Sequence, residues 1–142
     1  MAKSGGVWNG LLRIYIGLYF LYSVHSKLSP VFFSNLKDQL ISFSNNDPLW
    51  FYDAFLRYFA IPNSFIVALL IVAGELFAGI FLTAGFITRV AAFAAILLNL
   101  NYLLAMYWMG PAVLGVNLTF LMCELVIIFT DAGKSIGLDG LF

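Results

Sequence analysis

The amino-acid sequence predicts an all-α protein embedded in a membrane as a four-helix bundle, with one or two short interfacial helices between the first and second helices. Hydrophobic residues make up 63% of its 142 residues and charged residues only 10%. A soluble domain is about half apolar and about a quarter charged. The apolar residues also fall in long runs, and most of the few charges lie in clusters between these runs.

Four apolar runs are each long enough for a helix to cross the hydrocarbon core of a bilayer, which takes about 20 residues. They lie at about residues 7–28, 62–87, 89–109 and 111–130. The last two share a stretch without any formal charge between Arg89 and Glu124, which is too long for one crossing at about 1.5 Å per residue. The chain is therefore expected to reverse at Gly110-Pro111, within a single membrane domain at residues 1–142.

Residues 30–60, between the first two runs, have a different pattern. Ser29-Pro30 and Asp47-Pro48 each place a capping side chain before a proline, which is typical of a helix start. Apolar residues then recur at helical spacing opposite polar ones, which indicates amphipathic helices lying in the membrane interface. An ordinary packed loop is the alternative interpretation.

Four crossings would place both termini on the same side of the membrane. Lysine and arginine favour the cytoplasmic side, and here they favour the terminal side slightly. The two groups are Lys3, Arg13, Arg89 and Lys134 on the terminal side against Lys27, Lys37 and Arg57 on the other. The termini are therefore expected to be cytoplasmic. The first ten residues lack a cleavage pattern and are interpreted as a tail before a signal anchor.

The composition excludes several classes of function. A net charge of zero without a basic run argues against a nucleic-acid partner. A single cysteine, Cys123, and a single histidine, His25, cannot form a zinc tetrad or a two-histidine haem site, so no metal site is expected. Redox chemistry would need a partner subunit or a bound group such as a quinone or a pigment. His25 is either an interfacial hydrogen-bonding residue or a ligand to such a pigment.

Polar residues inside the apolar runs form the candidate site, because a charge at the bilayer centre costs about 2.5 to 3.5 kcal/mol unless it has a partner. This intramembrane polar cluster comprises Arg13, Glu75, Arg89, Asn99, Asn101, Asn117 and Glu124. Helical rise places Glu75 near the midplane as a candidate proton site, in contact with at least one of the arginines or asparagines of the cluster. We expect Glu124 near Arg13 at matched depth, and Arg89 at the same surface. The cluster either only fastens helices together or forms a proton, quinone or small-substrate site.

The aromatic residues lie mostly near the ends of the runs, where tyrosine and tryptophan usually form interfacial belts. A belt is therefore the expected role of Tyr52 and Tyr102, among others.

A set of charged and small residues occurs along the chain: Arg13, Gly17, Lys27-Leu28, Gly74-Glu75, Gly79, Gly85, Thr88-Arg89, Ala132-Gly133-Lys134 and Leu138-Asp139. In these features the sequence resembles the DoxX family (DoxX- and DoxD-like small membrane proteins of bacteria and archaea) over nearly the whole chain. The chain departs from the family at Ser23 and His25, where a glycine often occurs, and at Gly137, which replaces a serine. The resemblance implies a four-helix bundle, linked in name to a thiosulfate:quinone oxidoreductase and elsewhere to membrane-associated redox assemblies.

These observations lead to one main hypothesis and two alternatives. The main hypothesis is a small accessory, non-catalytic subunit of a larger electron-transfer complex in a bacterial or archaeal cytoplasmic membrane, in contact with lipid and with other subunits or further copies. The first alternative is a quinone-linked oxidoreductase subunit of the thiosulfate:quinone type, with Glu75 as proton acceptor and Arg13 or Arg89 holding an anionic substrate. The second is transport of a small solute or a proton.

Overall fold

The computed structural model describes residues 3–46 and 48–142, which form helices and turns and contain no strand. The α-helices in these ranges are α1 (Lys3–Lys27), α2 (Pro30–Asn45), α3 (Trp50–Phe55), α4 (Ser64–Ala84), α5 (Thr88–Met106) and α6 (Pro111–Phe129). A π-helical turn, Leu56–Ala60, continues α3. Short 3-10 turns occur at Tyr107–Met109, Ala132–Lys134 and Leu138–Gly140. The predicted all-α fold class is confirmed.

Three helical segments of the described chain are long and apolar enough to cross a membrane. They are Ser64–Ala84, Thr88–Met109 and Pro111–Phe129, with mean hydropathies of 2.6, 1.8 and 2.2. The fourth predicted crossing corresponds to α1, which has 25 residues but falls outside this group. Arg13 and Lys27 both lie in α1, and their charges lower its hydropathy.

The segment between α1 and α4 is helical, so the alternative of a packed loop is wrong. Ser29 caps α2 by accepting a hydrogen bond from the backbone N–H of Phe32, and Pro30 occupies the first turn, as predicted. Leu36 and Leu40 on one face of α2 are buried. The second expected cap, Asp47, lies outside the described residues.

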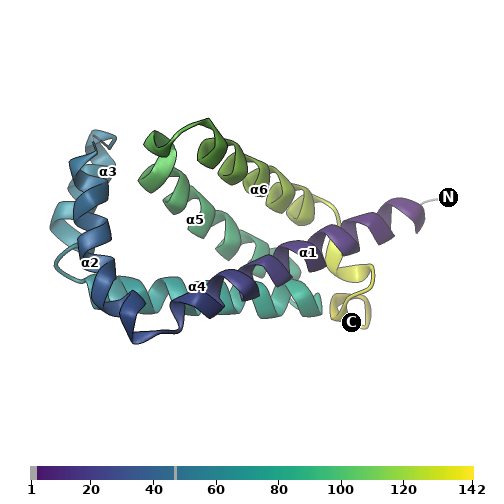
Figure 1. Cartoon of the computed structure of the whole chain (residues 1–142). Helices are drawn as coiled ribbons and strands as arrows, with labels where there is room; N and C mark the ends of the chain where they lie inside the picture. Colours follow the sequence, from purple (N-terminus) through teal and green to yellow (C-terminus); the bar gives the residue numbers. More distant parts are fainter. Residues whose placement is uncertain (1–2, 47) are drawn as a thin grey trace.

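Figure 1 shows how the helices are arranged. Helix α1 runs along and across α4, while α5 and α6 form an antiparallel pair beside them. Helices α2 and α3 stand at the end where α1 finishes and α4 begins, and the two termini lie together at the opposite end (Figure 1). Both ends of the chain therefore lie at one end of the molecule, as an even number of crossings would require.

Small residues allow α1 and α4 to approach closely where they cross. A Cβ atom added to Gly79 of α4 would lie 2.8 Å from side-chain atoms of Leu21 on α1. Gly17 of α1 faces the backbone of Thr83 at similarly short range. This close crossing brings the last turns of α1 to the middle of α4, and it thereby positions the site described below.

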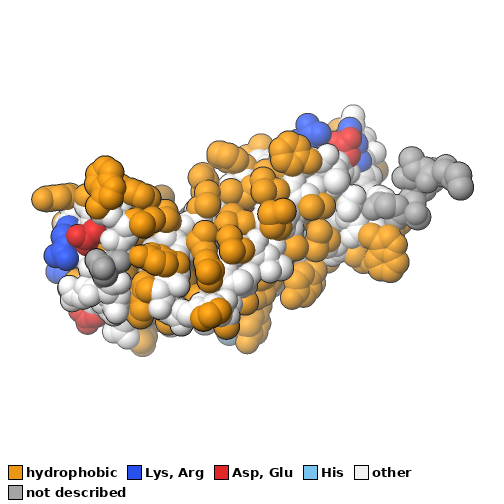
Figure 2. All heavy atoms as spheres, turned by 90° about the horizontal axis from the view of Figure 1, so that it is seen from above, with side chains coloured by type: hydrophobic (Ala, Val, Ile, Leu, Met, Phe, Trp, Pro, Cys, Tyr) orange, Lys and Arg blue, Asp and Glu red, His pale blue; other side chains and the backbone are white. Residues whose placement is uncertain are grey.

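The buried apolar side chains form two clusters. One joins α1, α4, α5 and α6 near the terminal end and includes Ile16, Leu82 and Ile127. The other holds α2 and α3 against α4 and α5, and it includes Leu40 and Leu56. The outer surface is apolar as well, and Figure 2 shows hydrophobic side chains between two ends that carry the visible charged ones.

Candidate functional site

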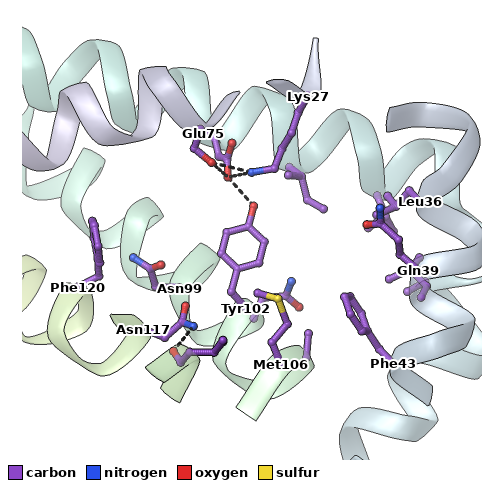
Figure 3. A pocket seen from close by; sticks show the side chains of 18 of the residues that line it. Lys27, Leu36, Gln39, Phe43, Glu75, Asn99, Tyr102, Met106, Asn117 and Phe120 are labelled. Atoms are coloured by element: carbon purple, nitrogen blue, oxygen red, sulfur yellow. Dashed lines mark hydrogen bonds and ion pairs between the residues drawn. The ribbon is translucent and has the colours of Figure 1, made fainter. Parts of the chain in front are cut away.

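A cavity of about 520 Å³ lies between the helices, bordered by α1, α2, α3, α4, α5 and α6. Its lining is mostly apolar and includes Leu36 and Phe43 of α2, Met106 of α5 and Phe120 of α6 (Figure 3). Polar side chains are few and enter from α1, α2, α4, α5 and α6. Pockets for organic ligands typically have volumes of about 300–1,000 Å³ and this kind of lining.

A buried ion pair lies at one wall of the cavity. The ammonium of Lys27, at the end of α1, donates to Oε1 of Glu75 in the middle of α4 at 2.6 Å. It also donates to Ser23 Oγ at 2.8 Å, and Ser23 in turn donates to Glu75 Oε1 at 3.3 Å. Ser23 and Lys27 are four residues apart and therefore share a face of α1. The pair is held by two turns of α1 and one turn of α4.

Tyr102 of α5 completes this group from the opposite side. Its hydroxyl donates to Glu75 Oε1 at 2.5 Å, and its ring lies 5.3 Å from the Lys27 nitrogen (Figure 3). Three donors thus converge on one carboxylate oxygen. Glu75 Oε2 is buried without a partner in the described part of the chain, and the third N–H of Lys27 has no oxygen partner there.

The amide side chains form a second polar wall. Asn99 of α5 donates through Nδ2 to Oε1 of the buried Glu124 on α6. Asn117 of α6 donates through Nδ2 to the Val113 carbonyl at 2.9 Å. Both asparagines are more than nine-tenths buried and line the cavity.

Asn101 has a different partner. Tyr52 of α3 donates its hydroxyl to Asn101 Oδ1 at 3.0 Å. Burial raises the pKa of Tyr52 to about 12, so this tyrosine remains a hydrogen-bond donor at neutral pH. The contact ties α3 to α5 and closes one side of the cavity, so Tyr52 is a buried structural residue and not part of an exposed aromatic belt.

The expected partners of Glu75 are corrected by this geometry. Its hydrogen bonds go to Ser23, Lys27 and Tyr102, and none goes to an arginine or asparagine of the predicted cluster. Sequence reasoning placed Lys27 at the membrane surface and Tyr102 in a belt. The sequence contained one indication that Tyr102 faces inward. Asn99, Tyr102 and Met106 follow the helical spacing of a single face, so Tyr102 shares the face of a predicted cluster residue.

Arg13 and Glu124, expected to lie near each other, share no hydrogen bond or ion pair in the described residues. Arg13 is fully buried, and its guanidinium donates to the backbone carbonyls of Leu82, Thr83, Ala132 and Ile136. The last turn of α4 and the C-terminal segment thus supply its acceptors, as helix C-termini often do for arginine. Glu124 has Asn99 as its hydrogen-bond partner, and no ion pair involving Glu124 occurs within residues 3–46 and 48–142.

Arg13 belongs to a junction that holds the end of the chain against α4 and α5. Asp139 accepts hydrogen bonds from the backbone N–H groups of Ile87 at 2.7 Å and Thr88 at 2.9 Å, and its own N–H donates to the Gly85 carbonyl. Burial by itself raises the pKa of Asp139, but hydrogen bonds from Thr88 and Ile87 and the Arg13 charge outweigh it and hold the pKa below its ordinary value. Asp139 therefore caps α5, which has no capping side chain of its own.

The remaining candidates lie apart from the cavity. Arg89 is exposed and pairs with Asp131 at 3.0 Å, so it does not reach either buried carboxylate. His25 is exposed and is not among the residues that line the cavity. No group of three or more potential metal-ligand side chains occurs in the described ranges.

Comparison with known proteins places this arrangement in a family. The sequence model of the family described as "TQO small subunit DoxD" matches residues 8–142. This chain belongs to the DoxD family. No curated protein and no solved structure matches it. The resemblance to DoxX- and DoxD-like proteins was thus correct in kind, and the family is DoxD and not DoxX itself.

The residues that carried the resemblance occupy three places in this DoxD chain, and one of them is the α1–α4 crossing, where Gly17 and Gly79 lie. Lys27 and Glu75 form the ion pair at the cavity wall. The others that carry charge or permit a close turn, Arg13, Gly85 and Asp139 among them, build the junction at the terminal end. The sequence features of the chain thus separate into a helix crossing, a structural junction and a cavity.

Proposed function

We propose that this chain is the membrane-embedded small subunit of a TQO-type complex, in which it binds a lipid-soluble quinone. The cavity with the Lys27–Glu75 pair in its wall is the observation that carries the proposal. A small subunit is what the description of the family names. TQO is understood here as thiosulfate:quinone oxidoreductase, so a quinone is the apolar substrate of the reaction.

The proposal includes four membrane crossings, by α1, α4, α5 and α6. Helix α1 has 25 residues and is therefore roughly 37 Å long at about 1.5 Å per residue, which exceeds the hydrocarbon thickness. The two charged groups within its apolar run, residues 7–28, do not require water, because Arg13 donates to backbone carbonyls and Lys27 pairs with Glu75. Charged side chains at both ends of the molecule and apolar ones between them support this orientation (Figure 2). Helices α2 and α3 would then lie in the interface opposite the termini.

The subunit is proposed to be accessory, in the sense that electrons reach the quinone from a partner subunit. The chain has one cysteine and one histidine, too few to build an iron–sulfur cluster or a two-histidine haem site. Its contribution would be to hold the quinone ring in a dry, shaped cavity at the correct depth. The apolar outer faces of its helices would contact lipid and the partner subunit.

Glu75 and Lys27 are the residues proposed to exchange a proton with the bound ring. Reduction of a quinone consumes two electrons, here from the sulfur substrate, and two protons, which form the two O–H bonds of the quinol. The third N–H of Lys27 is free to donate to a ring oxygen, and Glu75 holds the compensating negative charge behind it. One of the two protons would pass through this pair.

The test is activity of the assembled complex. The full chain is co-purified with its partner subunits in mild detergent, and thiosulfate-dependent reduction of an added quinone is measured. Glu75→Gln keeps the size of the side chain and an acceptor for Tyr102 but removes the proton site, so kcat should fall about 10²-fold or more while the complex stays assembled. The matched control is Arg57→Gln, which removes an exposed charge that is not part of the cavity lining. Full activity of the Glu75→Gln complex would contradict the proposed proton role, and a chain that never co-purifies with other subunits would contradict the subunit role.

A further inference from the structure

The cavity carries a second polar feature that the proposed function does not use. The amide oxygens of Asn99 and Asn117 come from neighbouring helices, α5 and α6, and both residues line the cavity. Asn99 is 6% exposed and Asn117 is 8% exposed. No described residue donates a hydrogen bond to Oδ1 of either asparagine. These are two acceptor atoms in an apolar surrounding without a donor.

The orientation of each amide is fixed by its nitrogen. The partner of Asn117 Nδ2 is the backbone carbonyl of Val113, which can only accept, so Oδ1 must be the other atom. Asn99 directs Nδ2 to Oε1 of the buried Glu124, so its Oδ1 is the atom left for the cavity. Figure 3 shows the oxygen of Asn99 turned toward Tyr102 and its nitrogen turned away. Glu124 thus acts as a positioning residue that keeps the Asn99 oxygen directed into the cavity.

We propose that the Asn99–Asn117 wall recognises a hydroxyl group of the ligand, and that the cavity therefore binds the reduced quinol more tightly than the oxidised quinone. This inference rests on the proposed quinone-binding function. A quinone ring has two carbonyl oxygens and no donor, so it leaves both amide oxygens without a partner. A quinol carries an O–H at each end of the ring and satisfies the amide wall with one of them.

The opposite wall accommodates the other end of the same ligand. Lys27 offers a free N–H, which an oxygen accepts in either redox state. The Lys27 wall therefore does not distinguish the two forms, and the preference arises at the amide wall alone. Tighter binding of the quinol makes the bound quinone easier to reduce, because the reduced form is stabilised relative to the oxidised form within the cavity.

The test measures binding to the purified full-length chain under anaerobic conditions by equilibrium dialysis. The probes are a decyl-substituted benzoquinone, its hydroquinone and the dimethyl ether of that hydroquinone. The hydroquinone should bind about tenfold more tightly than the quinone, which corresponds to about 1.4 kcal/mol and to one or two hydrogen bonds. The dimethyl ether, which has no O–H, should bind no better than the quinone.

Variants locate the source of the preference. Asn117→Leu should reduce the tenfold ratio to about twofold or less, since its nitrogen partner is only a carbonyl within the same helix. Asn99→Leu removes the other amide oxygen, and the affinity ratio of this variant measures the contribution of that oxygen independently. The matched control, Asn63→Leu, removes an amide that lies outside the cavity lining and, like Asn117, donates to the carbonyl four residues earlier, so it should leave the ratio unchanged.

The outcomes separate this inference from the proposed function. Equal affinity for hydroquinone and quinone would overturn the hydroxyl-recognising wall and leave quinone binding intact. A preference that survives in both asparagine variants would also overturn it. Absence of binding of any probe would overturn the quinone-binding function and the inference together.

Discussion

Replacing Lys27 with methionine tests the buried ion pair, because methionine keeps most of the side-chain length and removes the charge. The variant leaves Glu75, which is fully buried, with only Ser23 and Tyr102 as donors. Removing one partner of a buried pair costs about 3–5 kcal/mol. Because two donors remain and the Lys27 side chain is 20% exposed, we expect the lower end, about 3 kcal/mol of unfolding free energy.

Replacing the other partner, Glu75, should lower the unfolding free energy less. Glu75→Gln leaves Lys27 without a carboxylate, but its long side chain can turn toward the surface, so about 1–2 kcal/mol is expected. The double variant should be less destabilised than the two single effects together, with a coupling energy of about 2 kcal/mol. Unfolding by SDS in mixed micelles, followed by near-UV circular dichroism, measures each value. Arg57→Met, at the exposed pair with Asp53, serves as the control and should have a much smaller effect. Additive single effects, or a Lys27→Met effect as small as the control, would refute the reasoning.

Three further predictions concern the terminal junction and the topology. Asp139→Asn should lower the unfolding free energy by about 1 kcal/mol at neutral pH through loss of the α5 cap. Since the folded pKa of Asp139 is lowered, its stabilisation is complete above the ordinary pKa of 3.8 and is lost as the pH falls through the folded pKa, so a pH series of unfolding should show a smaller acid-induced loss in the variant. Gly85→Ala should destabilise the fold because Gly85 has φ +68 and no room for a Cβ, and thermal unfolding in detergent checks this. Single cysteines at Lys3 and Lys37, in a Cys123→Ala background, should react with a membrane-impermeant maleimide from opposite sides of the membrane because α1 lies between them; labelling from the same side would contradict a crossing by α1 and therefore four crossings.

The sequence was sufficient for the long helices because their formation depends on local quantities. Length of the apolar runs, Pro30 and Pro111 at helix starts and Gly85 at the end of α4 each act within a few residues. Helix α1 begins at Lys3, somewhat before the expected start at Val7, because the polar residues there continue the helix outside the apolar run. Such differences at helix ends do not change the fold.

The partners of the buried charged residues could not be predicted from helical rise, which gives only the depth of a residue along its helix. Depth along each helix suggested Arg13 for Glu124, but rotation about the helix axis decides which face a side chain occupies. Lys27 was assigned to the surface, yet its long chain reaches back to Glu75 because α1 crosses α4 closely at that point. The acceptors of Arg13 come from an irregular C-terminal segment, which no periodicity predicts.

The central claim, that the cavity holds a quinone, is tested most directly by photolabelling. A quinone with an azide on its ring is irradiated with the purified chain, and labelled peptides are identified by mass spectrometry. We predict labels on cavity residues of α5 and α2, such as Tyr102, Met106 and Phe43, and their loss when excess unlabelled quinol is present. Labels confined to outward-facing residues such as Phe93 and Leu97, or labels that excess quinol does not remove, would contradict it.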